Sequence, residues 1–359
     1  MNFDRSIRLE EEAFTTGGVS VGDIDGDGHL DIILAKGRHW PLIQLVLLND
    51  GKGGFERRFE LSRHADRTYT ATLVDLNLNG NLDLVVGNDR PDENLVYFND
   101  GYGRFTRAGT FGEPMWPTRN VTVIDLNGNG YPDLVVANRV GSGESTNYIC
   151  MNDGNGNFPS YRPFSRESAT TIAAGDLVGN GVPDLIVPHR DGGQSYLYIN
   201  DGAGGFAKRH PIGPARSATR AVGLGDLTGN GHLDIVLGDE LHGGAVIYLN
   251  LGNLQFEGPI PIGGKETVFA IAVADISGDG SADIVLGYKN APSIVLINDG
   301  SGRTFHTLHF GDGKGSVYGL AVGDFDGDGR LDIVAARSDA PSMLYFNRPD
   351  GDNVQPSKT

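Results

Sequence analysis

The chain has few of the features that mark a disulfide-bonded or membrane protein. It holds one cysteine in 359 residues, Cys150, so an intrachain disulfide is excluded, and we expect this residue to be inert core. No apolar run approaches the roughly 18 residues of a membrane span. The opening MNFDRSIRLEEE is no signal peptide. We expect no membrane insertion, and a protein that is either cytoplasmic or exported by a signal absent from this chain.

Basic residues are also scarce. Lys and Arg number 29 against 46 Asp and Glu, for a net charge of −17, and they form no basic stripe. Nucleic acid is therefore not an expected partner. Glycine, in contrast, is abundant at 54 residues, while 39% of the chain is hydrophobic. This composition excludes a helical protein and still allows a large core.

One aspartate-rich motif recurs along the chain at intervals of 49 to 52 residues. A fixed period in this range indicates a repeat architecture. The seven copies are DIDGDGHLD (23–31), DLNLNGNLD (75–83), DLNGNGYPD (125–133), DLVGNGVPD (176–184), DLTGNGHLD (226–234), DISGDGSAD (275–283) and DFDGDGRLD (324–332).

Short strands surround each motif. An apolar run precedes it, a second follows it, and a third ends in an NDG-type turn that leads to a fourth segment beginning with phenylalanine. Four antiparallel strands per repeat make a propeller blade. The last repeat lacks its fourth segment, and residues 3–9 resemble one. We predict an all-β, seven-bladed propeller over residues 1–347, closed by the N-terminal strand, with a flexible tail at 348–359.

The aspartate motif offers oxygen ligands from the side chains at positions 1, 3, 5 and 9. Hard oxygen donors in a flexible loop suit Ca²⁺ better than Mg²⁺. An EF-hand is rejected, because it needs a glutamate at position 12, where the first loop has Leu34 within a strand. The loops are therefore expected to bind calcium as structural sites.

The combination of strand, DxDxDGxxD loop, strand and NDGxGxF turn resembles the FG-GAP/VCBS repeats of integrin α-subunit propellers and their bacterial relatives. The resemblance covers residues 1–347. It implies a Ca²⁺ site between the first and second strands of a blade, on the bottom face of the propeller.

The seven loops are not equal. Loops 1 and 7 keep aspartate at all four side-chain positions, whereas Val178 in loop 4 cannot be a ligand. We expect the strongest calcium binding in loops 23–31 and 324–332, and the weakest or none in loops 176–184 and 226–234. The expected ligands are Asp23, Asp25, Asp27, Asp31, Asp75, Asn77, Asn79, Asp83, Asp125, Asn127, Asn129, Asp133, Asp275, Ser277, Asp279, Asp283, Asp324, Asp326, Asp328 and Asp332.

The opposite, upper face should carry the ligand site, in the axial funnel. Two series of residues are expected there from the repeat register. The first series lies six residues before each motif and comprises Gly17, Tyr69, Arg119, Thr170, Arg220, Phe269 and Tyr318. The second series lies thirteen residues after each motif starts and comprises Lys36, Asn88, Asn138, His189, Asp239, Tyr288 and Arg337.

The residue types in these series differ from blade to blade, which favours an asymmetric site over ordinary solvated loop positions. Arginine can bind carboxylate, sulfate or phosphate, and a tryptophan can stack on a sugar or wedge between blades. The upper loops of blades 1 and 3 are the longest. Candidate ligand-binding residues are Lys36, Trp40, Tyr69, Asn88, Trp116, Arg119, Asn138, His189, Arg220, Asp239, Tyr288, Tyr318 and Arg337.

Two functions fit this sequence. The first is a monomeric, calcium-stabilised binding module for a glycan, in particular an anionic one, or for a protein. The alternative is a polysaccharide lyase or sugar dehydratase that acts by β-elimination. Its candidate catalytic residues are His189, Tyr69, Tyr288 and Tyr318 as base or acid, with Arg119, Arg220 and Arg337 as charge neutralisers. Calcium loops of modest charge favour an extracellular or periplasmic location without excluding the cytoplasm.

Overall fold

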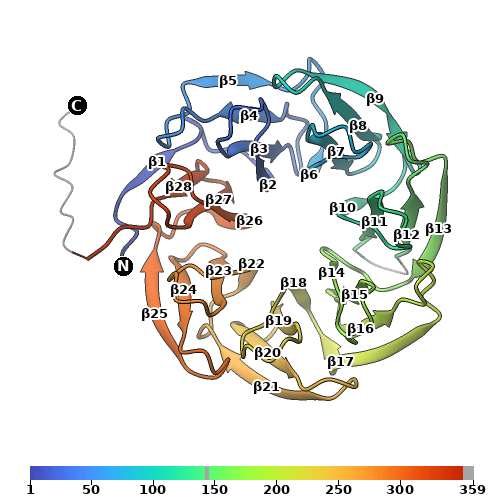
Figure 1. The fold of residues 1–359 in the computed structure, drawn as a ribbon, viewed down its shortest axis with the longest axis vertical. Coiled ribbons are helices and arrows are strands. Elements are labelled where there is room, and N and C mark those ends of the chain that lie inside the picture. The colour runs from blue at the N-terminus through green and yellow to red at the C-terminus, as the bar shows by residue number, and fades with distance from the viewer. Residues whose placement is uncertain (142–144, 351–359) are drawn as a thin grey trace.

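The computed structural model describes residues 1–141 and 145–350, which form seven four-stranded antiparallel sheets arranged in a ring (Figure 1). The predicted all-β, seven-bladed propeller is confirmed. The predicted tail from 351 onward and residues 142–144 of the predicted long loop in blade 3 lie outside the described residues. A search of the described part for helices long and apolar enough to cross a membrane finds none.

Each blade runs from an innermost strand at the axis to an outermost strand at the rim (Figure 1). The innermost strands are β2 (Thr16–Gly22), β6 (Thr68–Val74), β10 (Thr118–Ile124), β14 (Ala173–Gly175), β18 (Thr219–Gly225), β22 (Val268–Ala274) and β26 (Ser316–Gly323). The second strands are β3 (Asp31–Lys36), β7 (Asp83–Asn88), β11 (Asp133–Asn138), β15 (Asp184–Val187), β19 (Asp234–Asp239), β23 (Asp283–Tyr288) and β27 (Asp332–Ser338).

The outer half of each blade is more exposed. The third strands are β4 (Leu45–Leu48), β8 (Asn94–Asn99), β12 (Asn147–Met151), β16 (Gly193–Ile199), β20 (Ala245–Asn250), β24 (Ser293–Asn298) and β28 (Met343–Tyr345). The outermost strands are β5 (Arg57–Glu60), β9 (Phe105–Phe111), β13 (Ser160–Ser165), β17 (Lys208–Ser217), β21 (Phe256–Ile262), β25 (Phe305–Phe310) and β1 (Ser6–Arg8). Blades 1 to 6 start at β2, β6, β10, β14, β18 and β22, and blade 7 joins β26–β28 to β1.

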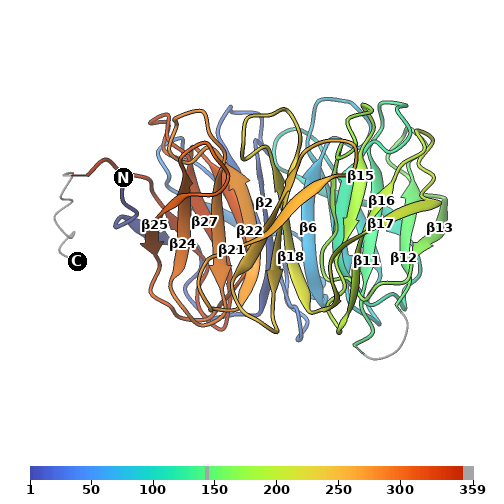
Figure 2. The same cartoon turned by 90° about the horizontal axis from the view of Figure 1, so that it is seen from below.

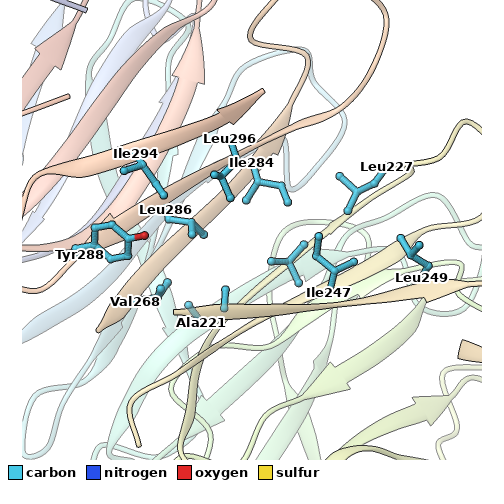
Figure 3. Packing of buried hydrophobic residues seen from close by; sticks show 12 residues of the cluster. Ala221, Leu227, Ile247, Leu249, Val268, Ile284, Leu286, Tyr288, Ile294 and Leu296 are labelled. Atoms are coloured by element: carbon cyan, nitrogen blue, oxygen red, sulfur yellow. The ribbon is translucent and has the colours of Figure 1, made fainter. Parts of the chain in front are cut away.

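The core lies between adjacent blades. Second strands such as β7 are buried at every position, which explains their Val and Leu runs. Figure 3 shows the packing of blade 5 against blade 6, where Ile247 and Leu249 lie on one side and Ile284 and Leu286 on the other. Seen from the side, the blades stand next to one another around the axis (Figure 2). Each blade therefore buries both of its faces only because it has two neighbours.

The N-terminal strand closes the ring, as predicted. Strand β1 pairs with β28, with Ile7 opposite Leu344. Beyond it, Glu10 is 3% exposed, accepts hydrogen bonds from Ser342 of blade 7, and forms an ion pair with Lys36 of blade 1 at 2.9 Å. Arg348, assigned to the tail from the sequence, pairs with Asn2. Backbone pairing and a buried ion pair thus join the two ends of the ring.

One asparagine per blade links that blade to the preceding one. It ends the third strand, and its Nδ2 donates to a backbone carbonyl in the preceding blade's aspartate loop at 2.7 to 3.0 Å. These asparagines are Asn49, Asn99, Asn152, Asn200, Asn250, Asn298 and Asn347, and all are buried. The link runs around the whole ring, because Asn49 of blade 1 bonds to Phe325 of blade 7.

A β-bulge interrupts the pairing of the first two strands at the upper end of six blades. In blade 2, Thr68 pairs with Asn88 and Thr70 with Gly87, so Tyr69 is the extra, unpaired residue. A bulge turns the side chain of the extra residue away from its regular direction. In each of these six blades the extra residue belongs to the first series predicted from the sequence.

Candidate functional site

The upper end of the axis holds a cavity of about 400 Å³. All seven residues of the first series line it, as do Arg38, His39, Asp89, Arg139 and Arg190. The volume falls within the range of small-molecule sites, which are about 300–1,000 Å³. The repeat register thus brings the first series together around the axis.

The second series is not brought to this cavity. Asn88 and Asn138 are buried and hydrogen-bonded to Thr68 and Thr118 of the adjacent innermost strands. The reason is the register of the bulge: each second-series residue of the six bulged blades pairs with the residue just before the bulge. Its side chain therefore stays within the sheet rather than facing the axis.

The other members of the second series have local structural partners. Tyr288 is 2% exposed and donates to the Gly263 carbonyl at 2.5 Å. Arg337 is 4% exposed and forms an ion pair with Asp312 at 2.5 Å. Lys36 pairs with Glu10, as described above.

The side chains of His189 and Asp239 likewise accept hydrogen bonds from nearby backbone N–H groups. The Nδ1 of His189 accepts a hydrogen bond from the Asp191 N–H, and Asp239 accepts one from the Leu241 N–H. Neither is among the residues that line the axial cavity. None of the second series therefore faces a ligand in that cavity.

The two tryptophans differ in their environment. Trp116 is 7% exposed and stacks on Tyr148 with ring centroids 4.1 Å apart. Of the two uses expected for a tryptophan, the structure places Trp116 in packing. Trp40 is 71% exposed on the upper loop of blade 1, where it remains available to a ligand.

Arginines and aromatic rings alternate around the cavity wall. The Arg119 guanidinium lies 4.2 Å from the Tyr69 ring centroid, and the Arg220 guanidinium lies 3.9 Å from that of Phe269. Tyr318 is shared, with Arg220 at 4.7 Å and Arg38 at 3.8 Å. Such cation–π contacts hold the guanidinium groups in place and leave their edges free to donate.

Ion pairs between neighbouring blades fix most of these arginines. Arg119 pairs with Asp89 at 2.9 Å, and Arg139 pairs with Asp191 at 2.6 Å. These carboxylates were not among the sequence candidates. The position fourteen residues after each motif starts, just beyond the second series, would have revealed Asp89, Arg139 and Arg190.

Glu240 accepts hydrogen bonds from two arginines, Arg190 at 2.8 Å and 2.9 Å and Arg220 at 3.0 Å. Burial raises the pKa of the Glu240 carboxyl, but hydrogen bonding to Arg190 and the charges of both arginines outweigh burial and leave this pKa below its ordinary value. Burial, followed by repulsion from Arg190, lowers the pKa of Arg220 to about 10. Five guanidinium groups therefore face three carboxylates, and the cavity wall is positive.

On the bottom face, three carboxylates converge in loop 1 and three in loop 7. They are Asp23, Asp25 and Asp31, and Asp324, Asp326 and Asp332, with ligand atoms within 4.8 Å of one another in each loop. Within the described residues, no other aspartate loop forms such a group of three carboxylates.

These two loops fit a cation. One oxygen each of Asp25 and Asp326 is buried without a hydrogen-bond partner. Burial raises the pKa of Asp31 to about 6 and that of Asp332 to about 7, and repulsion from the nearby aspartates adds to the effect. Clustered, desolvated oxygens of this kind are the donor set that Ca²⁺ takes.

All seven loops also hold their turns together through hydrogen bonds from backbone N–H groups to the first aspartate. In loop 4, Asp176 accepts from the N–H groups of Gly179, Asn180 and Gly181. Loop 2 differs from the other six loops at its fourth position, where Leu78 has φ 58° and the other loops have glycine. A leucine with this φ is strained by roughly 1–2 kcal/mol.

Solved structures of similar fold were found. Two are crystal structures of BBS1N in complex with ARL6DN, one soaked with lead and the other with mercury. The lead-soaked structure has a TM-score of 0.63 and 13% identity, and the match covers 97% of each chain. The mercury-soaked structure has a TM-score of 0.66 and 13% identity, with 96% of each chain covered. At this identity the likeness shows the fold alone.

A comparison with curated proteins finds no match. A family model does match, the FG-GAP-like repeat. Its matches cover residues 23–86, 75–136, 125–187, 226–286 and 276–335. These matches span more than half of the chain, and each includes at least one aspartate loop. The chain belongs to the FG-GAP-like repeat family.

Proposed function

We propose that this protein is a calcium-stabilised binding module that recognises an acidic carbohydrate in the axial cavity. The observation that carries the proposal is the cavity wall, where arginines lie on aromatic rings and outnumber carboxylates. Aromatic rings stack on sugar faces, and guanidinium groups bind oxyanions. The exposed Trp40 adds a second stacking surface at the upper face.

Calcium has a structural role in this proposal. Asp23, Asp25 and Asp31 would hold one ion and Asp324, Asp326 and Asp332 another. The ion supplies positive charge that offsets the repulsion among these carboxylates. Both loops lie at the end of the ring opposite the axial cavity, so they are not placed to contact a ligand there. Structural sites made of oxygen donors are filled by millimolar calcium, and we accordingly propose an exported protein.

A protein ligand on the upper face is the second candidate. Trp40, Met115 and Leu241 are large apolar residues of the upper loops, and they are 71%, 62% and 63% exposed. Exposed apolar side chains of this size favour an interaction surface. Both similar propellers described above were solved in complex with ARL6DN, which concerns those proteins and not this chain.

The elimination enzyme has less support. Of its candidate residues, Tyr69, Arg119, Arg220 and Tyr318 line the cavity, but His189 does not. Burial raises the pKa of Tyr69, which disfavours the phenolate that a base would need. We therefore keep elimination as an outcome of the test rather than as the proposal.

The test is calorimetric titration with acidic and neutral oligosaccharides in saturating calcium. Thr170 lines the cavity, and we expect Thr170→Phe to abolish binding of the acidic sugars by filling it. Ser160→Phe on the exposed outermost strand β13 is the matched control and should bind as the wild type does. If Thr170→Phe still bound the acidic sugars, the binding site would lie outside the axial cavity. A rise in ultraviolet absorbance during the titration would reveal elimination instead.

A further inference from the structure

Arg38 is held in place by the upper loop of blade 1. The N–H groups of Gly37 and Arg38 both donate to the Thr15 carbonyl at 3.0 Å. Gly37 has φ 101°, and a Cβ there would lie 2.3 Å from the Asp66 carbonyl oxygen, so the loop packs tightly against blade 2. Backbone hydrogen bonds between Leu42 and Asp66 extend this contact. The Arg38 side chain therefore projects from an anchored backbone.

The Arg38 guanidinium differs from the other four in the cavity. It lies 3.8 Å from the Tyr318 ring centroid, and its Nε donates to the Ser338 hydroxyl at 3.3 Å. Unlike the other four, it forms no ion pair with any carboxylate of the described residues. Its Nη1 and Nη2 groups likewise have no acceptor there. A half-buried cation without a counter-ion is costly, unless a ligand supplies one.

The surroundings of Arg38 repel cations and attract anions. Burial, then the charges of Arg38 and Arg119, lowers the pKa of the neighbouring His39, which keeps its imidazole neutral at pH 7. Asp89 already pairs with Arg119. The next carboxylate, Asp339, is exposed and makes no ion pair with Arg38. An anionic group that enters the cavity thus meets an unpaired guanidinium beside a neutral histidine.

We propose that Arg38 binds the carboxylate of an acidic sugar through its Nη1 and Nη2 groups while it rests on the Tyr318 ring. Two parallel N–H donors match the two oxygens of a planar carboxylate. Because Nε is engaged by Ser338, the end of the guanidinium is the edge that remains free. This inference rests on the proposed function and names the group that sets its specificity.

The test combines a substitution in the protein with a chemical change in the ligand and measures the affinity of each combination. A uronate oligosaccharide and its carboxyl-reduced, neutral analogue are titrated into the wild type and into Arg38→Gln. We expect Arg38→Gln to weaken uronate binding by about tenfold or more and to leave binding of the neutral analogue unchanged. Arg38→Lys keeps the positive charge but loses the pair of parallel N–H donors. Its affinity for the uronate should lie between those of the wild type and Arg38→Gln.

The control is Arg303→Gln, an exposed arginine that pairs with Glu257 away from the cavity. It should bind both ligands as the wild type does, and thermal unfolding in calcium checks that every variant is folded. Equal uronate binding by Arg38→Gln and wild type would overturn the role of Arg38 and leave the proposed function standing. A wild type that binds no acidic sugar would overturn the proposed function itself. A sulfated oligosaccharide is titrated in parallel, and weaker binding of that sugar alone by Arg38→Gln would show that Arg38 binds sulfate rather than carboxylate.

Discussion

At the residue scale, the asparagine that ends each third strand has several roles at once. In Asn250, the backbone N–H donates to Asp234 at 2.7 Å, and Nδ2 donates to Leu177 of the preceding blade at 2.8 Å. Its Oδ1 accepts from the Gly252 N–H in the turn. This one residue therefore fixes the turn, the aspartate loop of its own blade and the contact with the preceding blade.

We expect Asn250→Ala to lower the free energy of unfolding by about 2–4 kcal/mol, since buried carbonyl groups lose their donor. Asn155 occupies an exposed position in the equivalent turn of blade 3, and Asn155→Ala should change stability by at most about 0.5 kcal/mol. Chemical denaturation followed by fluorescence measures both. Similar losses in the two variants would show that the inter-blade hydrogen bond contributes little.

At the element scale, loops 1 and 7 share the same four aspartates but differ in their arginine neighbours. Within the described residues, the loop-1 carboxylates meet one arginine, Arg57, which is itself mostly exposed. The loop-7 carboxylates Asp326 and Asp328 meet Arg5, Arg330 and Arg348. Two of these arginines, Arg5 and Arg348, come from the two terminal segments of the chain. Because all three pair with loop-7 carboxylates, they already supply positive charge where a cation would bind.

We therefore predict that loop 1 binds calcium more tightly than loop 7, by roughly tenfold, because the ion competes with the loop-7 arginines. Calorimetric titration of the metal-free protein should resolve a tight and a weaker phase. Asp25→Asn should remove the tight phase, and Asp326→Asn should leave it intact. If Asp25→Asn kept the tight phase, the tighter calcium site would be in loop 7 rather than in loop 1.

At the scale of the whole molecule, one short strand completes the last blade and helps to close the ring. Strand β1 covers the edge of β28, and Phe3 and Leu9 beside it are 5% and 1% exposed. An uncovered strand edge is a template for pairing with another chain. The stability of the ring and the protection of the β28 edge thus depend on the same segment.

We expect a variant that lacks residues 2–9 to melt roughly 10 °C lower, because it loses the burial of Phe3 and Leu9, and to form oligomers through β28. Calorimetry and light scattering measure the two effects. A synthetic peptide of residues 1–12 should restore both the melting temperature and the monomer. Failure of the peptide to rescue would argue against simple edge pairing.

Many features of the fold could be predicted from residues alone. The aspartate loops recur with a nearly constant period. The last repeat lacks the phenylalanine that begins a fourth segment, and Phe3 at the N-terminus indicates which segment takes its place and closes the ring. The first series could be assigned to the axis for the same reason, since each member occupies the same place relative to its loop. Local pattern suffices here because every blade repeats one strand order.

The site required the tertiary structure. Asn88 and Asp89 are adjacent in the chain, yet one is buried in blade 2 and the other pairs with Arg119 of blade 3 at the cavity. That difference depends on a bulge opposite Asn88 and on the position of the next blade, neither of which leaves a periodic signal.

The sequence by itself thus determined the repeat, the strand order and the loops suited to a cation. These follow from local periodicity and from the chemistry of aspartate and glycine. Only the tertiary structure decided which of the five cavity arginines are neutralised by a carboxylate, and that Arg38 alone among them forms no ion pair within the described residues. The physical reason is that the partner of a charge lies across the gap between blades, where contacts depend on the closed ring rather than on sequence distance.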